Sequence, residues 1–212
     1  MSVGSLRGVV PAEALEWVAG TSICDDRAMP EALSGRLLVA TPLLEDGNFR
    51  RAVVLVCSHD QTGAFGVILN RPLDELVEAH LPRWAGRSAP PRVLFGGGPV
   101  ETNRVIALGR RRSEGETPGW AHVAPGIGLL DLGIPPEELA PGVDAIRLFA
   151  GYAGWGSGQL EHEIEQDSWF VVDAFPRDVF AAEPRDLWRT VLRRQASPLA
   201  IYAMFPEDTA LN

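Results

Sequence analysis

The chain has 212 residues, of which 46% are hydrophobic and 22% are charged, a length that suits one large core better than two ordinary domains. Its 28 acidic and 19 basic residues give a net charge of −9, which opposes nonspecific binding to nucleic-acid backbones. No run of 18 apolar residues and no signal-peptide pattern occurs, so neither a membrane span nor secretion is indicated, and a cytoplasmic location is predicted.

Residues 1–34 combine short apolar pieces with glycine, proline and charge, and they are predicted to be an appendage, either mobile or docked, to a domain that spans 35–212. Apolar runs rich in β-branched residues predict three early strands, at Leu37–Ala40, Ala52–Cys57 and Gly66–Asn70. Asp74 and Glu75 suit the N-terminus of a helix that is predicted over Asp74–His80.

The middle of the chain alternates loops and short apolar segments. Proline, glycine and arginine predict a surface loop at Arg83–Arg92. Further elements are predicted as strands at Val93–Phe95, Val105–Leu108 and Val123–Leu130, and a short helix at Pro136–Leu139.

The stretch Ala145–Val172 is predicted to form a strand, a sharp glycine turn, a helix and a second strand. The turn is assigned to Gly151, Gly154, Gly156 and Gly158. A later helix is predicted over about Pro184–Gln195, followed by an apolar segment at Leu199–Phe205.

This glycine-rich stretch carries none of the usual nucleotide or serine-nucleophile motifs. Gln159 stands where GxGxxG requires its third glycine, and Ser157 lacks the flanking glycines of GxSxG. A P-loop is excluded because the chain has no lysine, all 19 basic residues being arginines. A tight packing turn is therefore the default interpretation.

Five blocks do resemble a known family. They are GRLLVATP (Gly35–Pro42), FRRAVVLVCSHD (Phe49–Asp60), GAFGVILNRPL (Gly63–Leu73), FGGGPV (Phe95–Val100) and GYAGWGSGQLEHEI (Gly151–Ile164), in the family's order. The chain is thereby identified as a member of the bacterial YqgE/AlgH family, also called UPF0301 or DUF179. The resemblance implies a single α/β domain whose mixed, bifurcated sheet curls into a pseudo-barrel with helices packed outside. It implies no catalytic set, and the family's label of transcriptional regulator is the functional clue that it offers.

Cys57 and His59 are two apart, a spacing that points both side chains to one face of a strand, as a nucleophile pair or metal site would need. A buried core cysteine is the competing interpretation. His80, His122 and His162 show no ligand spacing, and Cys24 and Cys57 alone make no disulfide framework. No catalytic residue, metal or cofactor is predicted.

One constellation is a candidate ligand site, if strand ends bring its members together. Arg71 would offer a bidentate guanidinium, glycine N–H groups an anion nest, and Trp155 an apolar wall. The candidate residues are Asn70, Arg71, Gly96, Gly97, Gly98, Trp155 and Gln159. A packing role predicts that they are buried and mutually satisfied, whereas a ligand site predicts a concave pocket with Arg71 partly open.

Three functions therefore compete. The favoured one is a non-enzymatic binding or regulatory protein, a monomer or weak oligomer, whose partner is a protein or small molecule of unknown identity. The second is an enzyme or small-anion-binding domain that uses the constellation around Arg71. The third, direct DNA binding through Arg110, Arg111 and Arg112, is disfavoured by the acidic balance and by the adjacent Glu114 and Glu116.

Overall fold

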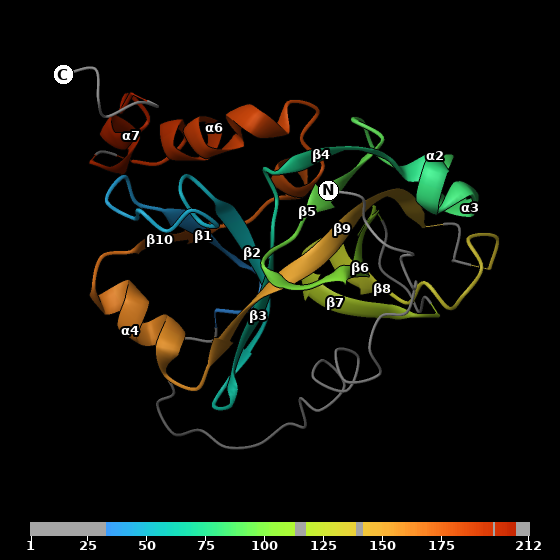
Figure 1. Ribbon diagram of the computed structural model, residues 1–212, viewed down its shortest axis with the longest axis horizontal. Coiled ribbons are helices and arrows are strands. Elements are labelled where there is room, and N and C mark those ends of the chain that lie inside the picture. Colours follow the sequence, from blue (N-terminus) through green and yellow to red (C-terminus); the bar gives the residue numbers. More distant parts are fainter. Residues whose placement is uncertain (1–32, 113–117, 139–141, 197, 207–212) are drawn as a thin grey trace.

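One long strand, β9 (Val143–Gly156), runs through the middle of the sheet and joins its two halves (Figure 1). The structure is a computed structural model that describes residues 33–112, 118–138, 142–196 and 198–206. The last part of β9 pairs with one half of the sheet and its earlier part with the other, so the sheet divides along this strand.

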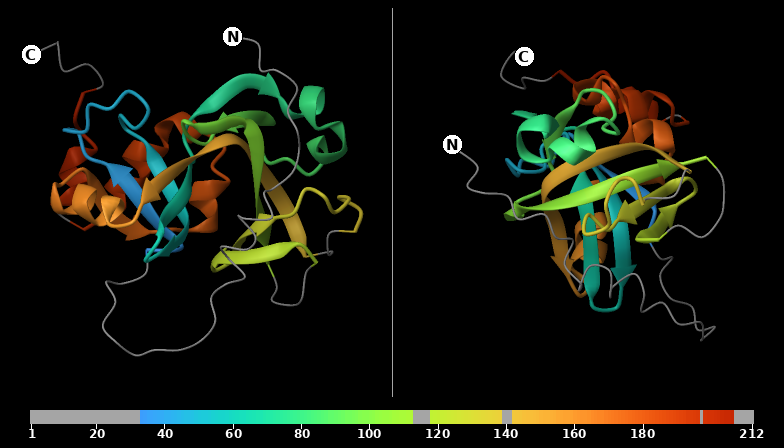
Figure 2. Two further views of the ribbon diagram at one scale, coloured as in Figure 1. Left: turned by 60° about the horizontal axis from the view of Figure 1, so that its bottom comes forward. Right: turned by 90° about the vertical axis from the view of Figure 1, so that its right-hand side faces the viewer.

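The main path of the sheet is antiparallel. Its strand order is β10 (Trp169–Asp173), β1 (Arg36–Ala40), β2 (Val53–Asp60), β3 (Gly63–Ile68), β9, β6 (Val100–Arg111), β8 (Ile127–Leu130) and β7 (Trp120–Ala124). Off this path, β4 (Pro72–Leu76) pairs with β5 (Val93–Gly96), and β5 lies parallel to β9, which makes the sheet mixed. Figure 2 shows the strands curling around a common interior.

The helices are short and lie outside this curl (Figures 1 and 2). They are α2 (Val77–His80), α3 (Pro82–Ala85), α4 (Gln159–Glu165), α5 (Pro176–Val179), the 3-10 helix η1 (Pro184–Asp186), α6 (Leu187–Arg193) and α7 (Leu199–Tyr202). The predicted α/β single domain with a curled, mixed sheet is confirmed.

The early strands are apolar without interruption because both of their faces are buried. Leu37 and Leu55 belong to the interior cluster that also contains Trp188 of α6. Leu38 and Val54, the neighbours on the opposite face, belong to a second cluster, which is covered by α4. A strand buried on both sides is expected to lose the usual alternation of polar and apolar residues.

Four predicted elements of the middle region need correction. The helix predicted at Pro136–Leu139 is a turn over its described residues, 136–138. The first three residues of the predicted helix 74–80 belong to strand β4, and only 77–80 form the helix α2. The predicted surface loop 83–92 begins inside α3, whose Trp84 is buried. The predicted strand 123–130 is a hairpin of β7 and β8, with Gly126 at φ +73° in its turn.

The predicted glycine turn is also displaced. Strand β9 continues through Gly151, Gly154 and Gly156, so the chain reverses only after Gly156. Gly158, at φ +72°, then adopts the left-handed conformation in front of α4. Glycine suits this position because it lacks the Cβ that makes the conformation unfavourable for other residues.

The predicted appendage lies almost wholly outside the described residues, as do Cys24 and Leu139. At its end, the Leu33 amide donates to His59 Nδ1 (3.1 Å), and Ser34 Oγ accepts from the His59 amide (2.9 Å). Both contacts join residues before β1 to the end of β2. Among the described residues, every helix is too short or too polar to span a membrane.

Candidate functional site

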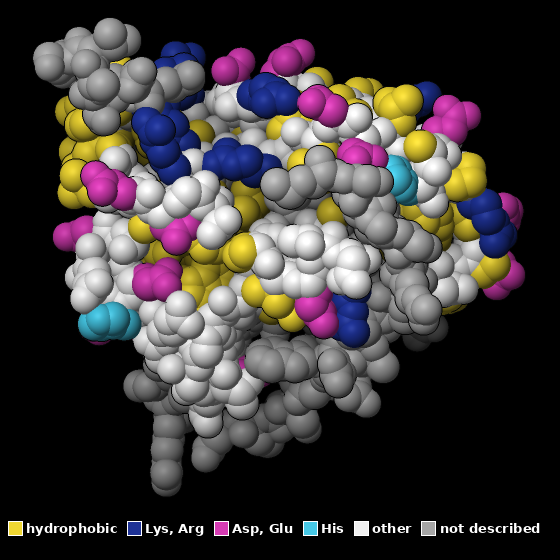
Figure 3. Space-filling model, in the orientation of Figure 1, with side chains coloured by type: hydrophobic (Ala, Val, Ile, Leu, Met, Phe, Trp, Pro, Cys, Tyr) yellow, Lys and Arg dark blue, Asp and Glu magenta, His cyan; other side chains and the backbone are white. Residues whose placement is uncertain are grey.

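A hollow of about 380 Å³ opens beside α6, and five of its lining residues are arginines. We call it the arginine hollow. It is lined by Arg50, Arg51, Asn70, Arg71, Pro72, Arg185, Trp188 and Arg189. Figure 3 shows basic side chains gathered at the upper left of the view, where Figure 1 has α6 and the β1–β2 connection.

Three chain segments supply these arginines. Arg50 and Arg51 end the β1–β2 connection, and Arg71 follows β3. Arg185 lies in η1 and Arg189 in α6, which follows directly, and both line the hollow while Trp188 is buried. The guanidinium forks therefore come from three directions around one hollow.

A buried amide holds Arg51 in place. Asn70 is 4% exposed, its Oδ1 accepts from the Val53 amide (3.0 Å), and its Nδ2 donates to Arg51 O (2.8 Å). Arg51 has φ +54°, a left-handed conformation that is costly for a residue with a Cβ. The Arg51 guanidinium also lies over the ring of Trp188, 4.5 Å from its centre, and Trp188 Nε1 donates to Ala40 O (2.8 Å).

We expect Asn70→Ala to lower the free energy of unfolding by about 1–3 kcal/mol, because it leaves the buried Val53 N–H and Arg51 C=O without their partner. Urea denaturation measures this change. The exposed Asn48→Ala is the control and should change stability by less than about 0.5 kcal/mol. An equal, small change in both variants would show that the Asn70 amide does not hold this loop.

Arg71 is partly buried among other cations. Its Nη1 donates to Asn70 O (3.5 Å) and its Nη2 to Arg50 O, and both of these acceptors are neutral carbonyls. Burial lowers the pKa of the Arg71 guanidinium from its ordinary value, because removing the cation from water disfavours the charged form. An anion in the hollow would offset this cost, since opposite charge at short range favours the cation.

Two of the three glycines proposed for the anion nest use their N–H groups within the protein. Gly96 N donates to Arg71 O and Gly97 N to Ala150 O, both at 2.8 Å. A Cβ at Gly97 or Gly98 would lie 2.2 Å from backbone atoms of β9, so these two glycines permit a close crossing. Gly96 lies next to Arg71: a Cβ added at Gly96 would be 3.7 Å from the Arg71 Cβ.

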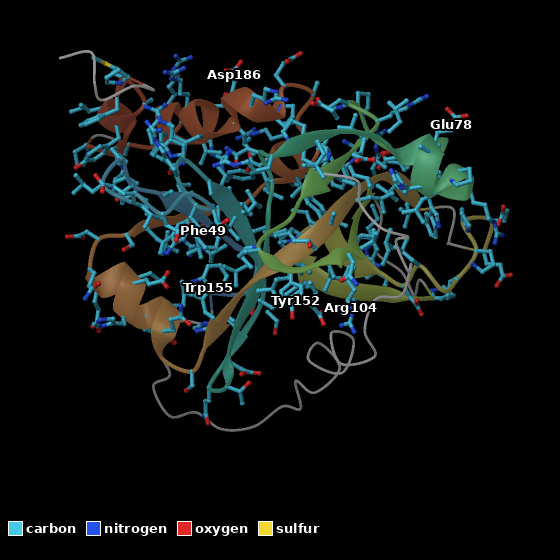
Figure 4. The ribbon with its side chains drawn as sticks, viewed as in Figure 1. Phe49, Glu78, Arg104, Tyr152, Trp155 and Asp186 are labelled. Atoms are coloured by element: carbon cyan, nitrogen blue, oxygen red, sulfur yellow. The ribbon has the colours of Figure 1, made fainter. Side chains whose placement is uncertain are left out.

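Trp155 and Gln159 lie outside the lining of the arginine hollow. Trp155 is 5% exposed and stacks on Phe49, with ring centres 6.1 Å apart (Figure 4). Gln159 Oε1 accepts from the Gly156 amide (3.1 Å), which joins the first residue of α4 to the end of β9. Because Phe49 directly precedes Arg50 and Arg51, Trp155 supports the arginine-bearing loop from inside and offers no wall to a ligand.

Cys57 is not available as a nucleophile. It is 3% exposed within the interior cluster, and burial strongly raises the pKa of its thiol. A register shift between Val56 and Ser58 also breaks the alternation that the predicted Cys57 and His59 pair requires. His59 instead binds Glu161 of α4 through Nε2 (2.9 Å). Within the described residues, no three acidic, histidine or cysteine side chains gather as a metal site would need.

Comparison with known proteins supports the resemblance found in the sequence. A model of the AlgH-like family DUF179 matches residues 37–200. The chain belongs to this AlgH-like family. A UPF0301 protein of Streptomyces coelicolor is 50% identical over 185 residues, which are 85% of this chain and 96% of that protein. A UPF0301 protein of Mycobacterium tuberculosis is 41% identical over 194 residues, 89% and 96% of the two chains.

Two solved structures share the AlgH-like fold. A crystal structure of a Corynebacterium diphtheriae protein superposes with a TM-score of 0.78 at 37% identity, covering 85% of this chain and 95% of that one. The solution structure of the AlgH protein of Pseudomonas aeruginosa gives 0.60 at 23% identity, covering 87% and 100%. The second likeness concerns the fold alone.

Proposed function

We propose that this AlgH-like chain is a cytoplasmic binding protein that takes an anionic group, a carboxylate or a phosphate, in the arginine hollow. One observation carries the proposal: five arginines line a single hollow in a chain whose net charge is −9. The acidic balance makes such a local gathering of cations unusual. Guanidinium groups suit oxyanions because their planar forks bind two oxygens at once.

Binding fits this lining better than acid–base catalysis does. The ionisable side chains that line the arginine hollow in the described part of the chain are all arginines. A guanidinium stays protonated near neutral pH, so it neither removes nor delivers a proton in a reaction. The lining can attract and orient an anion, and a regulatory effect would follow if the bound anion belongs to a partner.

Titration with inorganic pyrophosphate and with malonate tests the proposal and separates the phosphate from the carboxylate case. Isothermal calorimetry at low salt should give saturable binding by one of the two at submillimolar concentration, weakened by added salt. Arg71→Gln should weaken it by about tenfold or more, because a charge-assisted hydrogen bond contributes about 1.5–3 kcal/mol.

Arg110→Gln is the matched control, because Arg110 pairs with Asp144 on the hairpin side of the sheet. The Arg110→Gln variant should bind the anion with the same affinity as the unchanged chain. The proposal fails if neither anion binds, or if Arg71→Gln and Arg110→Gln have the same effect.

A further inference from the structure

A second hollow adjoins the arginine hollow and shares Arg50 and Arg51 with it. It measures about 290 Å³ and is lined by Thr41, Pro42, Leu44, Glu45, Arg50, Arg51, Phe205 and Pro206. We call it the apolar-rimmed hollow. It lies between the β1–β2 connection and the residues that follow α7.

Large exposed apolar side chains lie near this hollow in the sequence. The described residues leave six of them exposed, and four are in or next to its two lining segments: Phe205 (39% exposed) lines the hollow, Leu43 (81%) and Met204 (82%) are neighbours of lining residues, and Ile201 (59%) lies in α7 just before them. Single exposed apolar residues are ordinary, but a gathering of them marks interaction sites. This surface adjoins the cations of the arginine hollow.

Thr41 adds a polar group that lacks a partner. It is 4% exposed, and its Oγ1 has no hydrogen-bond partner among the described residues. A buried hydroxyl in this state is uncommon, because its lost hydration is normally replaced by a hydrogen bond. Thr41 is one of the residues that line the apolar-rimmed hollow, so this unpartnered hydroxyl lies just behind the wall of the hollow.

Arg51 shows which kind of group the shared wall binds. Its Nη2 donates to Phe205 O (2.8 Å) and to Pro206 O. These acceptors are successive main-chain carbonyls of a segment without helix or strand structure. The shared wall thus already holds polypeptide backbone.

Two other classes of partner fit less well. A nucleotide needs an open aromatic face for its base, but Trp188 is 2% exposed and is covered by the Arg51 guanidinium. An anionic membrane needs protruding cations on a flat surface, whereas Arg71 is recessed and the whole chain carries −9. A narrow chain that presents both charge and apolar side chains suits the two hollows better.

We propose that the two hollows together bind an extended segment of a partner protein in which an acidic side chain stands next to a large apolar one. The acidic group enters the arginine hollow, and the apolar group packs against Leu44 and Phe205 in the apolar-rimmed hollow. Charge complementarity and the exposed rim fix this choice of partner. The inference rests on the proposed function, since it states that the anionic group bound in the arginine hollow is a side chain of a partner protein.

The probe is a short fluorescein-labelled peptide in which aspartate and leucine alternate, titrated with the full chain and followed by anisotropy. Versions with asparagine for aspartate, or serine for leucine, should each bind about tenfold more weakly or worse. Equal affinity for all three peptides would overturn the proposal, and so would the absence of binding.

Leu43→Ser should weaken binding of the aspartate–leucine peptide by about fivefold or more while leaving the affinity for pyrophosphate or malonate unchanged. Leu76→Ser is the matched control, because Leu76 is also exposed (59%) but stands at the far end of β4 and lines neither hollow. A larger loss of peptide affinity in Leu43→Ser than in Leu76→Ser supports the proposal, and an equal loss in the two variants contradicts it. If the small anions bind and the peptide does not, the further inference fails alone; if neither binds, the proposed function fails too.

Three results would assign the surface to another occupant and overturn the partner assignment. If the chain binds vesicles rich in phosphatidylserine and the Leu43→Ser variant does not, the surface binds a membrane. Self-association lost in Leu43→Ser would indicate a second copy. A gain in peptide affinity on Glu207→Gln with Asp208→Asn, absent in the exposed control pair Glu78→Gln with Glu138→Gln, would indicate the chain's own end.

Discussion

Replacing Arg147 by alanine is expected to lower the free energy of unfolding by about 3–5 kcal/mol, which is among the largest effects of a single substitution. Arg147 lies in β9 and is 1% exposed. Its Nη1 donates to Val179 O (2.9 Å) and Ala181 O (3.0 Å), and its Nη2 donates to Pro90 O. One guanidinium therefore ties β9 to the end of α5 and to the segment before β5.

The cost comes from three sources. Alanine leaves the buried Val179 carbonyl and two partly buried carbonyls without this donor, opens a cavity, and removes the cation from the face of Phe95, whose ring centre is 4.3 Å from the guanidinium carbon. Burial lowers the pKa of Arg147 to about 10, so the group is still charged at neutral pH. The cation is balanced by carbonyl dipoles, and these are left unsatisfied when it is removed.

Chemical denaturation of Arg147→Ala, Arg147→Lys and Arg83→Ala measures this prediction. Lysine keeps the charge but loses the planar fork, so an intermediate loss is expected. Arg83 pairs with Glu137 on the surface, and its loss should cost less than about 1 kcal/mol. A loss in Arg147→Ala as small as that in Arg83→Ala would show that the interior bonds of Arg147 do not stabilise the fold.

The sequence predicted the elements whose burial is uniform. Leu37–Ala40 and Ala52–Cys57 are apolar on both faces, which specifies a central strand without knowledge of its neighbours. Strand β4 escaped prediction because Asp74 and Glu75 favour a helix start locally, whereas pairing of Pro72 and Leu76 with β5 decides the outcome. Tertiary pairing overrode a weak local preference there.

The site was only half predictable for a similar reason. Asn70 and Arg71 could be found because they interrupt an apolar run at the end of a strand. Arg185 and Arg189 reach the same hollow through packing of α6 on the sheet, which the sequence does not encode locally. Their spacing of four residues was the signal that the sequence offered for them.

Trp155→Ala is expected to lower the free energy of unfolding by about 3–5 kcal/mol, because a large aromatic side chain is lost from a packed interior. Trp155 contacts Phe49 and Trp169, with ring centres 6.1 and 6.2 Å away. Its Nε1 donates to Glu163 Oε2 (2.9 Å), which also accepts from Trp169 Nε1 (2.8 Å). The substitution therefore opens a cavity and loosens α4 at the same time.

Trp155→Phe separates packing from hydrogen bonding, since phenylalanine fills much of the space but cannot donate to Glu163. We expect it to cost less than half as much as alanine. Because Phe49 leads directly into Arg50 and Arg51, the alanine variant should also weaken anion binding while it is still folded, whereas Trp155→Phe should largely preserve it. Thermal unfolding and calorimetry of both variants measure the two effects. If Trp155→Ala kept its melting temperature and lost anion binding, Trp155 would be a contact of the ligand and its assignment to the interior would be wrong.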